Sequence, residues 1–248
     1  MRIGCTPFLN ARPLVWGLER EHEVFPLPPS QMAKALLAGK LDVALVPVVE
    51  MFRDRRLRML DAPAICCKGA VRSVRLLVRG GIGDRVLLRA DSRSGTSVLL
   101  AQLLLKRLFG VRRVQTVCVD TDRFSPRSLK PGEALLQIGD VALKAVARGC
   151  AVHDLGTLWK VMTGLPFVFA PWMVRRGRNP RGASAMLKKA VRDGMKDPKR
   201  VAKTYAPVGC DVATCTSYLK ENLSFHVGSA ERKAIRLFEK LLRQEGLL

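Results

Sequence analysis

The sequence lacks any apolar stretch long enough to cross a membrane. Its longest charge-free runs are about half of the roughly 20 residues that a bilayer-spanning helix needs. The N-terminus also lacks the long hydrophobic region and the small-residue cleavage site of a secretory signal. We therefore expect a cytoplasmic protein with no membrane partner.

Metal and redox motifs are also missing. The chain has three scattered histidines, which form no H-x-x-x-H or H-x-E pattern. It has seven cysteines, an odd number, and the spacing from Cys210 to Cys215 does not fit the C-x-x-C unit of zinc or redox sites. Free cysteines mostly behave as small buried apolar residues. We expect no metal site and no cofactor.

The sequence contains none of the common catalytic motifs. There is no P-loop, no G-x-G-x-x-G after a strand, no G-x-S-x-G and no H-E-x-x-H. The glycine-rich turn Gly80–Gly83 is not followed by a helix pattern, so we do not interpret it as a nucleotide-binding loop. These absences argue against the commonest nucleotide-binding enzymes, serine hydrolases and zinc proteases.

Acidic residues are few, because 21 Asp and Glu stand against 43 Lys and Arg and leave a net charge of +22. Such a balance favours anionic partners. The charge is spread along the chain, aromatic residues make up only 6% of it, and no nucleic-acid motif accompanies it. We expect a solvated basic surface and no specific nucleic-acid partner. The alternative, DNA binding, predicts strongly salt-dependent retention on DNA.

What the sequence does contain is an alternation of strand and helix patterns, separated by prolines and glycines. Short apolar runs such as Leu41–Pro47 are typical of buried strands, and Val98–Phe109 has the pattern of an apolar helix. Beyond Arg178 the pattern is helical throughout. The predicted class is α/β, with parallel strands and helices on both faces of the sheet.

An uncharged stretch, Leu165–Val174, contains two prolines, which exclude a helix interior and favour a packed strand. We interpret it as the return crossing from a middle lobe to a first lobe. A second crossing near Arg79–Arg85 is expected to complete a hinge. The predicted first lobe comprises residues 1–84 and 173–248, and the predicted second lobe comprises residues 85–172.

Small polar residues follow three predicted strands at the turns into helices. They are Asn10, the group Ser94, Thr96 and Ser97, and Asp140. Helix N-termini attract anions, and ligands of open α/β sheets bind where such turns converge. Taken singly, each residue is better explained as an ordinary helix cap. Together, the turns predict a cleft for a small anion such as a carboxylate.

Six stretches carry a family resemblance: Ile3–Leu14, Gly39–Glu50, Gly69–Val74, Asp91–Ser97, Ile138–Leu143 and Thr163–Trp172. In this order they resemble the MqnA family, the chorismate dehydratases of the futalosine route to menaquinone. The resemblance spans roughly residues 2–175 and owes little to the C-terminal helices.

The resemblance implies a two-lobed, type II periplasmic-binding-protein-like fold with a ligand cleft between the lobes. The implied reaction removes water from chorismate, a dicarboxylate, to give 3-[(1-carboxyvinyl)oxy]benzoate. Catalytic roles would fall to Asn10 and Ser73, although Ser73 fits equally well as an ordinary residue at the start of a strand. The implied substrate-binding residues are Ser94, Thr96, Ser97, Gly139 and Asp140.

These motifs contain no His, Glu or Lys that suits a general base near neutral pH. We hypothesise that the enolpyruvyl carboxylate of the substrate takes the C3 proton, while the protein supplies orientation and hydrogen bonds. Two positions depart from the family pattern, because Phe8 stands where Tyr is common and Gly95 where Arg is common. Arg93, two residues earlier, is a candidate to supply the positive charge that is missing at position 95.

Two alternatives remain at this point. One is a non-catalytic solute-binding protein for a small carboxylate, and the other is the 1,4-dihydroxy-6-naphthoate synthase of the same route. The opening motif Thr6–Asn10 argues against the synthase, and the lack of an export signal argues against the binding protein. The sequence does not distinguish a monomer from a homodimer.

Overall fold

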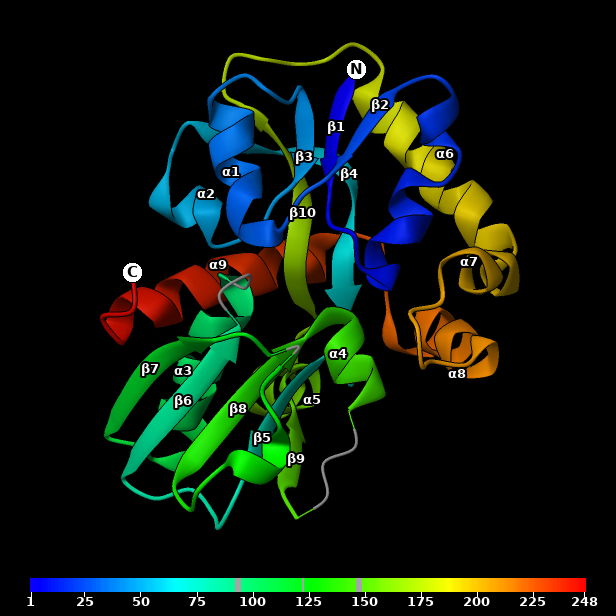
Figure 1. Cartoon of the computed structure of the whole chain (residues 1–248). Helices are drawn as coiled ribbons and strands as arrows, with labels where there is room; N and C mark the ends of the chain where they lie inside the picture. The colour runs from blue at the N-terminus through cyan, green and yellow to red at the C-terminus, as the bar shows by residue number, and fades with distance from the viewer. Residues whose placement is uncertain (92–94, 122, 146–148) are drawn as a thin grey trace.

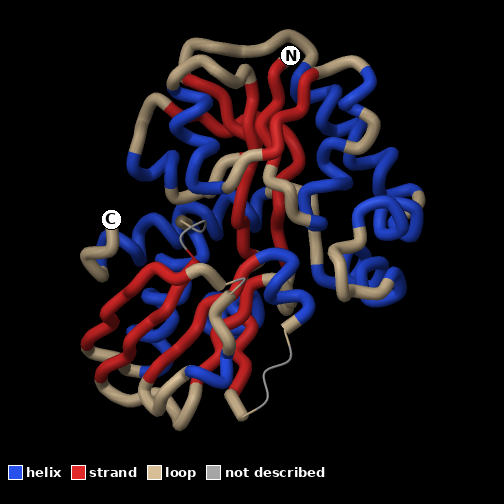
Figure 2. Tube along the Cα trace, in the orientation of Figure 1, coloured by secondary structure: helices blue, strands red, loops and turns tan. Residues whose placement is uncertain are grey.

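The computed structural model describes residues 1–91, 95–121, 123–145 and 149–248, and it contains two five-stranded sheets, one in each of two lobes (Figure 1). Figure 2 shows the strands at the centre of each lobe, with helices packed around them. This arrangement confirms the predicted α/β class.

The first sheet combines parallel and antiparallel pairs. In spatial order its strands are β2 (Glu23–Pro26), β1 (Arg2–Cys5), β3 (Val43–Leu45), β10 (Phe167–Arg175) and β4 (Leu57–Cys67). β1 runs parallel to β3, as predicted, and also to β2. β10 runs antiparallel to β3 and β4, so the expectation of parallel strands alone is wrong. The sequence pattern did not reveal β2, because most of its residues are exposed at the sheet edge and show no apolar alternation.

The second sheet is built in a similar way. In spatial order its strands are β7 (Arg113–Val119), β6 (Arg85–Asp91), β8 (Glu133–Ile138), β5 (Val74–Val78) and β9 (Ala151–Asp154). Here β6 is parallel to β7 and β8, and β5 is antiparallel to β8 and β9. The sequence analysis did not predict the short, partly exposed β9.

The chain passes between the sheets between β4 and β5, and it returns before β10. The predicted crossing near Arg79–Arg85 is wrong, because the strands on both sides of it, β5 and β6, belong to the second sheet. A boundary at residue 84 would assign β5 to the first lobe. However, β5 is hydrogen-bonded to β8 and β9, which belong to the second sheet. We propose that the lobes divide within residues 68–73 and 164–166.

Helices cover the outer faces of both sheets (Figure 1). Those of the second lobe are α3 (Thr96–Phe109), η3 (Pro126–Ser128), α4 (Gly139–Lys144) and α5 (Leu155–Thr163). The others are η1 (Leu9–Val15), η2 (Leu18–Arg20), α1 (Pro29–Leu37), α2 (Glu50–Arg53), α6 (Ala183–Lys196), α7 (Pro198–Tyr205), α8 (Val212–Ser217), the π turn η4 (Tyr218–Asn222) and α9 (Ser229–Gln244).

The last helix, α9, lies across the junction of the lobes (Figure 1). Its buried Phe238 packs edge-to-face against Phe167 of β10, with ring centroids 5.0 Å apart, and against Trp159 of α5 at 5.7 Å. Aromatic pairs in this geometry stabilise by about 1 kcal/mol beyond the area they bury. The uncharged stretch predicted as a crossing is therefore a core strand whose aromatic rings pack both lobes together.

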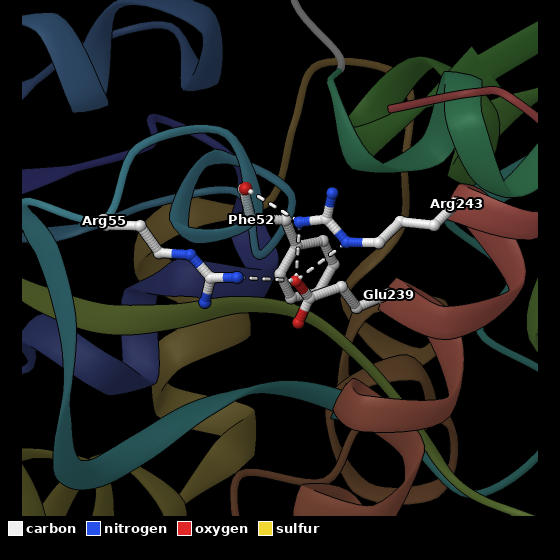
Figure 3. Close-up of polar contacts among 4 residues, drawn as sticks. All are labelled: Phe52, Arg55, Glu239 and Arg243. Atoms are coloured by element: carbon white, nitrogen blue, oxygen red, sulfur yellow. Dashed lines mark hydrogen bonds and ion pairs between the residues drawn. The ribbon is translucent and has the colours of Figure 1, made fainter.

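Polar contacts fix α9 to both lobes. Arg243 of α9 forms an ion pair of 2.8 Å with Glu239, one turn earlier in the same helix. Arg243 also donates a hydrogen bond of 3.4 Å to the carbonyl oxygen of Phe52 in the first lobe. Arg55 of the first lobe donates to Glu239 at 3.4 Å (Figure 3). Just beyond the end of α9, Glu245 forms an ion pair of 2.5 Å with Arg107 of α3 in the second lobe. The C-terminal end of the chain thus bridges the lobes.

Candidate active site

A cavity of about 70 Å³ lies between the two lobes. The first lobe contributes the end of β3 and parts of β4, β10 and η1, and the second lobe contributes the start of β5 and the N-terminal ends of α3 and α4. The lining residues are Thr6, Phe8, Asn10, Pro29, Leu45, Pro47, Ile65, Val71, Ser73, Val74, Gly95, Thr96, Ser97, Ile138, Gly139, Phe169 and Ala170.

Asn10 lies in the first turn of η1, with its side chain largely buried at the cavity. The predicted N-cap role is wrong, because the helix begins at Leu9 and Phe8 occupies the cap position. The buried Oδ1 of Asn10 has no hydrogen-bond partner, and the same is true of the buried Oγ1 of Thr6, which the sequence did not single out. Since buried polar atoms are normally paired, these two atoms mark a wall that suits a polar ligand.

Ser73 lies just before β5 and is buried. Its Oγ accepts a hydrogen bond of 2.7 Å from the hydroxyl of Tyr218, which is also buried and opens the π turn η4. Burial raises the pKa of Tyr218 above its usual value, although the neighbouring side chains of Ser73 and Asn10 oppose the rise. The hydroxyl therefore stays protonated and acts as a donor. No sequence pattern singled out Tyr218.

The loop before Ser73 is held by Asp154, the N-cap residue of α5. The carboxylate accepts hydrogen bonds from the backbone N–H of Val71 at 3.0 Å, of Arg72 at 2.6 Å and of Thr157 at 3.0 Å. Arg72 has a φ of +57°, in the left-handed region that costs a non-glycine residue about 1–2 kcal/mol. Asp154 therefore supports a strained segment whose next residue is Ser73.

At the start of α3, Thr96 and Ser97 are both buried and line the cavity. The Thr96 hydroxyl donates a hydrogen bond of 3.2 Å to the carbonyl oxygen of Phe169 on β10, so it joins the two lobes. The third member of the predicted cluster, Ser94, lies outside the described residues.

Gly139 begins α4 with a φ of +63°, and its N–H donates to the carbonyl oxygen of Ser73 at 2.8 Å. A Cβ at this position would lie 2.9 Å from the ring of Phe8, so glycine lets this ring of the first lobe pack on the second lobe. Asp140 does not line the cavity. Its Oδ1 accepts a hydrogen bond of 3.1 Å from the N–H of Leu9, so it links the lobes at the cavity rim.

Among the described residues that line the cavity, none has a charged side chain. Gly95 is at the N-cap position of α3, where a Cβ would lie 3.3 Å from Oε1 of Glu50. Arg93, the predicted substitute for a cation here, lies outside the described residues. Anionic groups of a ligand would therefore meet hydroxyl, amide and backbone donors on the described walls.

The described part of the chain lacks two other kinds of feature. It contains no cluster of three or more His, Cys, Asp or Glu side chains that could hold a metal ion. None of its helices combines the length and the apolar character that a membrane span requires.

Solved structures with the same architecture come from several sources. A protein of Archaeoglobus fulgidus superimposes with a TM-score of 0.80 at 15% identity, covering 100% of this chain and 98% of that chain. The alkanesulfonate-binding protein of Xanthomonas axonopodis pv. citri, bound to MOPS, gives 0.72 at 15% identity, covering 100% and 93%. These likenesses confirm the two-lobed, type II periplasmic-binding-protein-like fold.

Sequence comparison points to one family. The chorismate dehydratase of Thermus thermophilus is 28% identical over 261 residues, which cover 97% of this chain and 94% of that protein. The chorismate dehydratase of Campylobacter jejuni is 26% identical over 235 residues, covering 94% and 89%. A family model described as menaquinone biosynthesis matches residues 1–244. Because this match covers nearly the whole chain, the protein belongs to the menaquinone biosynthesis family.

Proposed function

We propose that this protein is a chorismate dehydratase, a carbon–oxygen lyase that converts chorismate to 3-[(1-carboxyvinyl)oxy]benzoate in the futalosine route. Membership of the menaquinone biosynthesis family and two relatives named chorismate dehydratase support this assignment. The observation that carries it is the cavity between the lobes, where Asn10, Ser73, Thr96 and Ser97 meet around apolar walls.

The chemistry of the walls favours a reaction in which the substrate supplies its own base. No described lining residue is an acid or a base near neutral pH. The enolpyruvyl carboxylate would take the proton from C3 and hydroxide would leave C4, so that the proton and the hydroxide together make the water released. Aromatisation of the ring drives the step, and positioning by the protein lowers the barrier.

In this proposal, Ser73 assists the departing hydroxide. Because the Tyr218 hydroxyl donates to Ser73 Oγ, the proton of Ser73 is free to point toward a second acceptor. A hydrogen bond from Ser73 to the C4 oxygen would strengthen as negative charge develops there. Asn10 can hold the ring through its amide group, because its unpaired Oδ1 can accept a hydrogen bond from a substrate hydroxyl and its N–H₂ can donate to a substrate oxygen.

The size of the cavity implies that the lobes separate to admit the substrate. Pockets that hold small ligands usually measure roughly 300–1,000 Å³, whereas this cavity measures about 70 Å³. Two hydrogen bonds close it across the lobes, from Thr96 to Phe169 and from Leu9 to Asp140. We therefore assign substrate entry to an opened arrangement in which these contacts are broken.

Incubation of the purified protein with chorismate tests the proposal, with product followed by mass and by ultraviolet absorbance. We expect one aromatic product lighter than chorismate by one water. Asn10→Ala and Ser73→Ala should each lower kcat by about 100-fold or more, the scale seen when a transition-state donor is removed. Ser184→Ala, on the partly exposed face of α6, is the matched control and should keep full activity.

Other outcomes would reassign the protein. Tight chorismate binding without product at high protein concentration would support a solute-binding protein, the function named for the Xanthomonas axonopodis neighbour. If Asn10→Ala and Ser73→Ala both kept full turnover, the assigned reaction would stand, but the catalytic roles proposed for these two residues would be wrong.

A further inference from the structure

Two thiols stand in contact outside the cavity. The thiol of Cys215 donates to the sulfur of Cys210 at an Sγ–Sγ distance of 3.2 Å, and both cysteines are free. A disulfide needs a sulfur separation of about 2.0 Å. The two atoms are therefore about 1 Å from bonding distance, so a small side-chain movement would bring them together.

The start of α8 explains why the thiols meet. Asp211 caps this helix, because its Oδ1 accepts from the N–H of Thr214 at 2.8 Å and its Oδ2 from the Thr214 hydroxyl at 2.7 Å. Cys210 precedes the cap, and Cys215 is the fourth residue of the helix. Residues at these two positions commonly pack together as a hydrophobic staple. Here both members of the staple are cysteines, which adds redox chemistry to a packing contact.

The pair lies in a segment that contacts the second lobe at both ends. On one side, the carbonyl oxygen of Val208 accepts a hydrogen bond of 3.0 Å from Lys144 of α4. On the other side, Tyr218 donates to Ser73 at the cavity. A covalent bond between Cys210 and Cys215 would constrain the segment that carries Tyr218.

We propose that Cys210 and Cys215 form a reversible intrachain disulfide with a low-molecular-weight disulfide such as oxidised glutathione as the oxidant. The Cys210 thiolate attacks the glutathione disulfide, forms a mixed disulfide and releases one glutathione. The Cys215 thiolate then attacks the Cys210 sulfur and expels the second glutathione. The protein loses two electrons and two protons, and one glutathione disulfide becomes two glutathiones.

Exposure sets the order of the two attacks. Cys210 is half-buried and can meet the oxidant, whereas Cys215 is fully buried. Burial raises the pKa of Cys215 to about 12, with the hydrogen bond to Cys210 as a further cause. Cys215 therefore acts as the resolving thiol, and its contact with Cys210 compensates for its low thiolate fraction by proximity.

Peptide mass spectrometry tests the proposal directly, because trypsin releases residues 204–220 as one peptide that contains both cysteines. The folded protein is equilibrated with oxidised glutathione, alkylated under denaturing conditions and digested. We expect this peptide to be two hydrogens lighter than its reduced form and unalkylated, and to return to two alkylated thiols after treatment with dithiothreitol.

Matched variants identify the bond. The lighter peptide should persist in Cys118→Ser, which removes an exposed cysteine elsewhere, and should vanish in Cys210→Ser and in Cys215→Ser. The fraction of oxidised peptide should follow a two-electron dependence on the potential of the glutathione buffer. The ratio of oxidised to reduced peptide should change tenfold for about 30 mV in that potential. Two alkylated thiols, or a stable glutathione adduct on Cys210 without ring closure, at every glutathione ratio would overturn the proposal.

Discussion

The hydroxyl of Tyr218 donates a hydrogen bond of 2.7 Å to Oγ of Ser73, a residue 145 positions earlier in the chain. Tyr218 follows α8, whereas Ser73 lies at the entry to the second lobe. The contact therefore joins the C-terminal helical segment to the loop that enters the second lobe. It also leaves the Ser73 proton free for a ligand, so the geometry of Ser73 depends on a residue that lies outside the cavity lining.

Tyr218→Phe should lower kcat for chorismate more than it lowers stability. The change removes one donor and leaves the ring in place, so we expect a loss of about 1 kcal/mol in the free energy of unfolding. We expect kcat to fall by about tenfold or more with a smaller change in KM, because Ser73 loses its fixed orientation. Steady-state kinetics and urea unfolding measure the two effects.

Tyr205→Phe is the matched control for this change, because Tyr205 is the other tyrosine of the chain. Its ring is half-buried and packs edge-to-face on Trp16, away from the cavity. The control should keep the kcat of the unaltered protein. An unchanged kcat in Tyr218→Phe would show that Ser73 needs no partner.

Local patterns were enough to predict the architecture and much of the cavity wall. Strand-to-helix turns place Thr96 and Ser97 at one edge of the second sheet, and Asn10 follows β1 of the first, whereas Gly139 was expected only from the family resemblance. Because parallel strands gather such turns at their carboxyl ends, their meeting at one cavity follows from the order of elements. The lobe crossing was misplaced because β5 resembles any short buried strand, and pairing partners are not encoded in an apolar run.

The roles of Tyr218 and Asp154 could not be predicted from the sequence for a different reason. Each acts through a contact distant in sequence, to Ser73 and to the backbone of Val71 and Arg72 respectively. Nothing local distinguishes a tyrosine within helical segments, or an aspartate at a helix start, from ordinary packing and capping residues. Such roles appear only when the tertiary structure places the partners.

Asp154→Asn should disturb the loop that carries Ser73. The amide keeps one acceptor oxygen but turns an N–H₂ group toward backbone donors, so the strained Arg72 loses its support. Because hydrogen bonds to charged groups contribute roughly 1.5–3 kcal/mol each, we expect the free energy of unfolding to fall by about 2 kcal/mol. We also expect kcat to fall by about tenfold.

Asp197→Asn provides the comparison, since Asp197 caps α7 by accepting from the N–H of Arg200 at 3.0 Å and has no contact with the cavity loop. Asn caps helices about as well as Asp, so stability and kcat should change little. If Asp154→Asn behaved like this control, Asp154 would be an ordinary cap of α5.

Glu133 should make the second lobe sensitive to acid. Its carboxylate contacts Arg89 through two hydrogen bonds, of 2.8 and 3.1 Å, and these bonds are the main reason that the pKa of Glu133 lies below its usual value. A depressed folded-state pKa contributes stability that is present above the unfolded-state value of 4.5 and is lost as pH falls through the folded-state value. The free energy of unfolding should therefore fall as pH drops below about 4.5.

Urea unfolding of Glu133→Gln at several pH values measures this contribution. The variant should be less stable than the unaltered protein at about pH 7, by about 1 kcal/mol, and the difference should shrink toward about pH 3. Asp84→Asn, which removes a looser and highly exposed pair with Arg112 at 3.6 Å, should show almost no difference at either pH. A gap between Glu133→Gln and the unaltered protein that stayed constant with pH would contradict the assignment.

Glu245 should influence how readily the lobes separate. It pairs with Arg107 and Lys106 of α3, at 2.5 and 3.5 Å, while Arg243 holds α9 on the first lobe (Figure 3). Opening would stretch the contacts to α3 and leave those within the first lobe intact. A partly exposed pair of this kind contributes about 0.2–1 kcal/mol and weakens as salt is added.

Glu245→Gln should therefore shift the balance toward the open arrangement by a factor of up to about five. If the closed lobes bind the substrate, KM for chorismate should rise by the same factor with kcat nearly unchanged, and added salt should raise KM of the unaltered protein toward that of the variant. Among the described residues, Glu239 pairs with Arg243 and Arg55, on the first-lobe side, so the KM of Glu239→Gln should stay at the original value. Equal KM values for both variants and the unaltered protein would mean that α9 does not hold the lobes together.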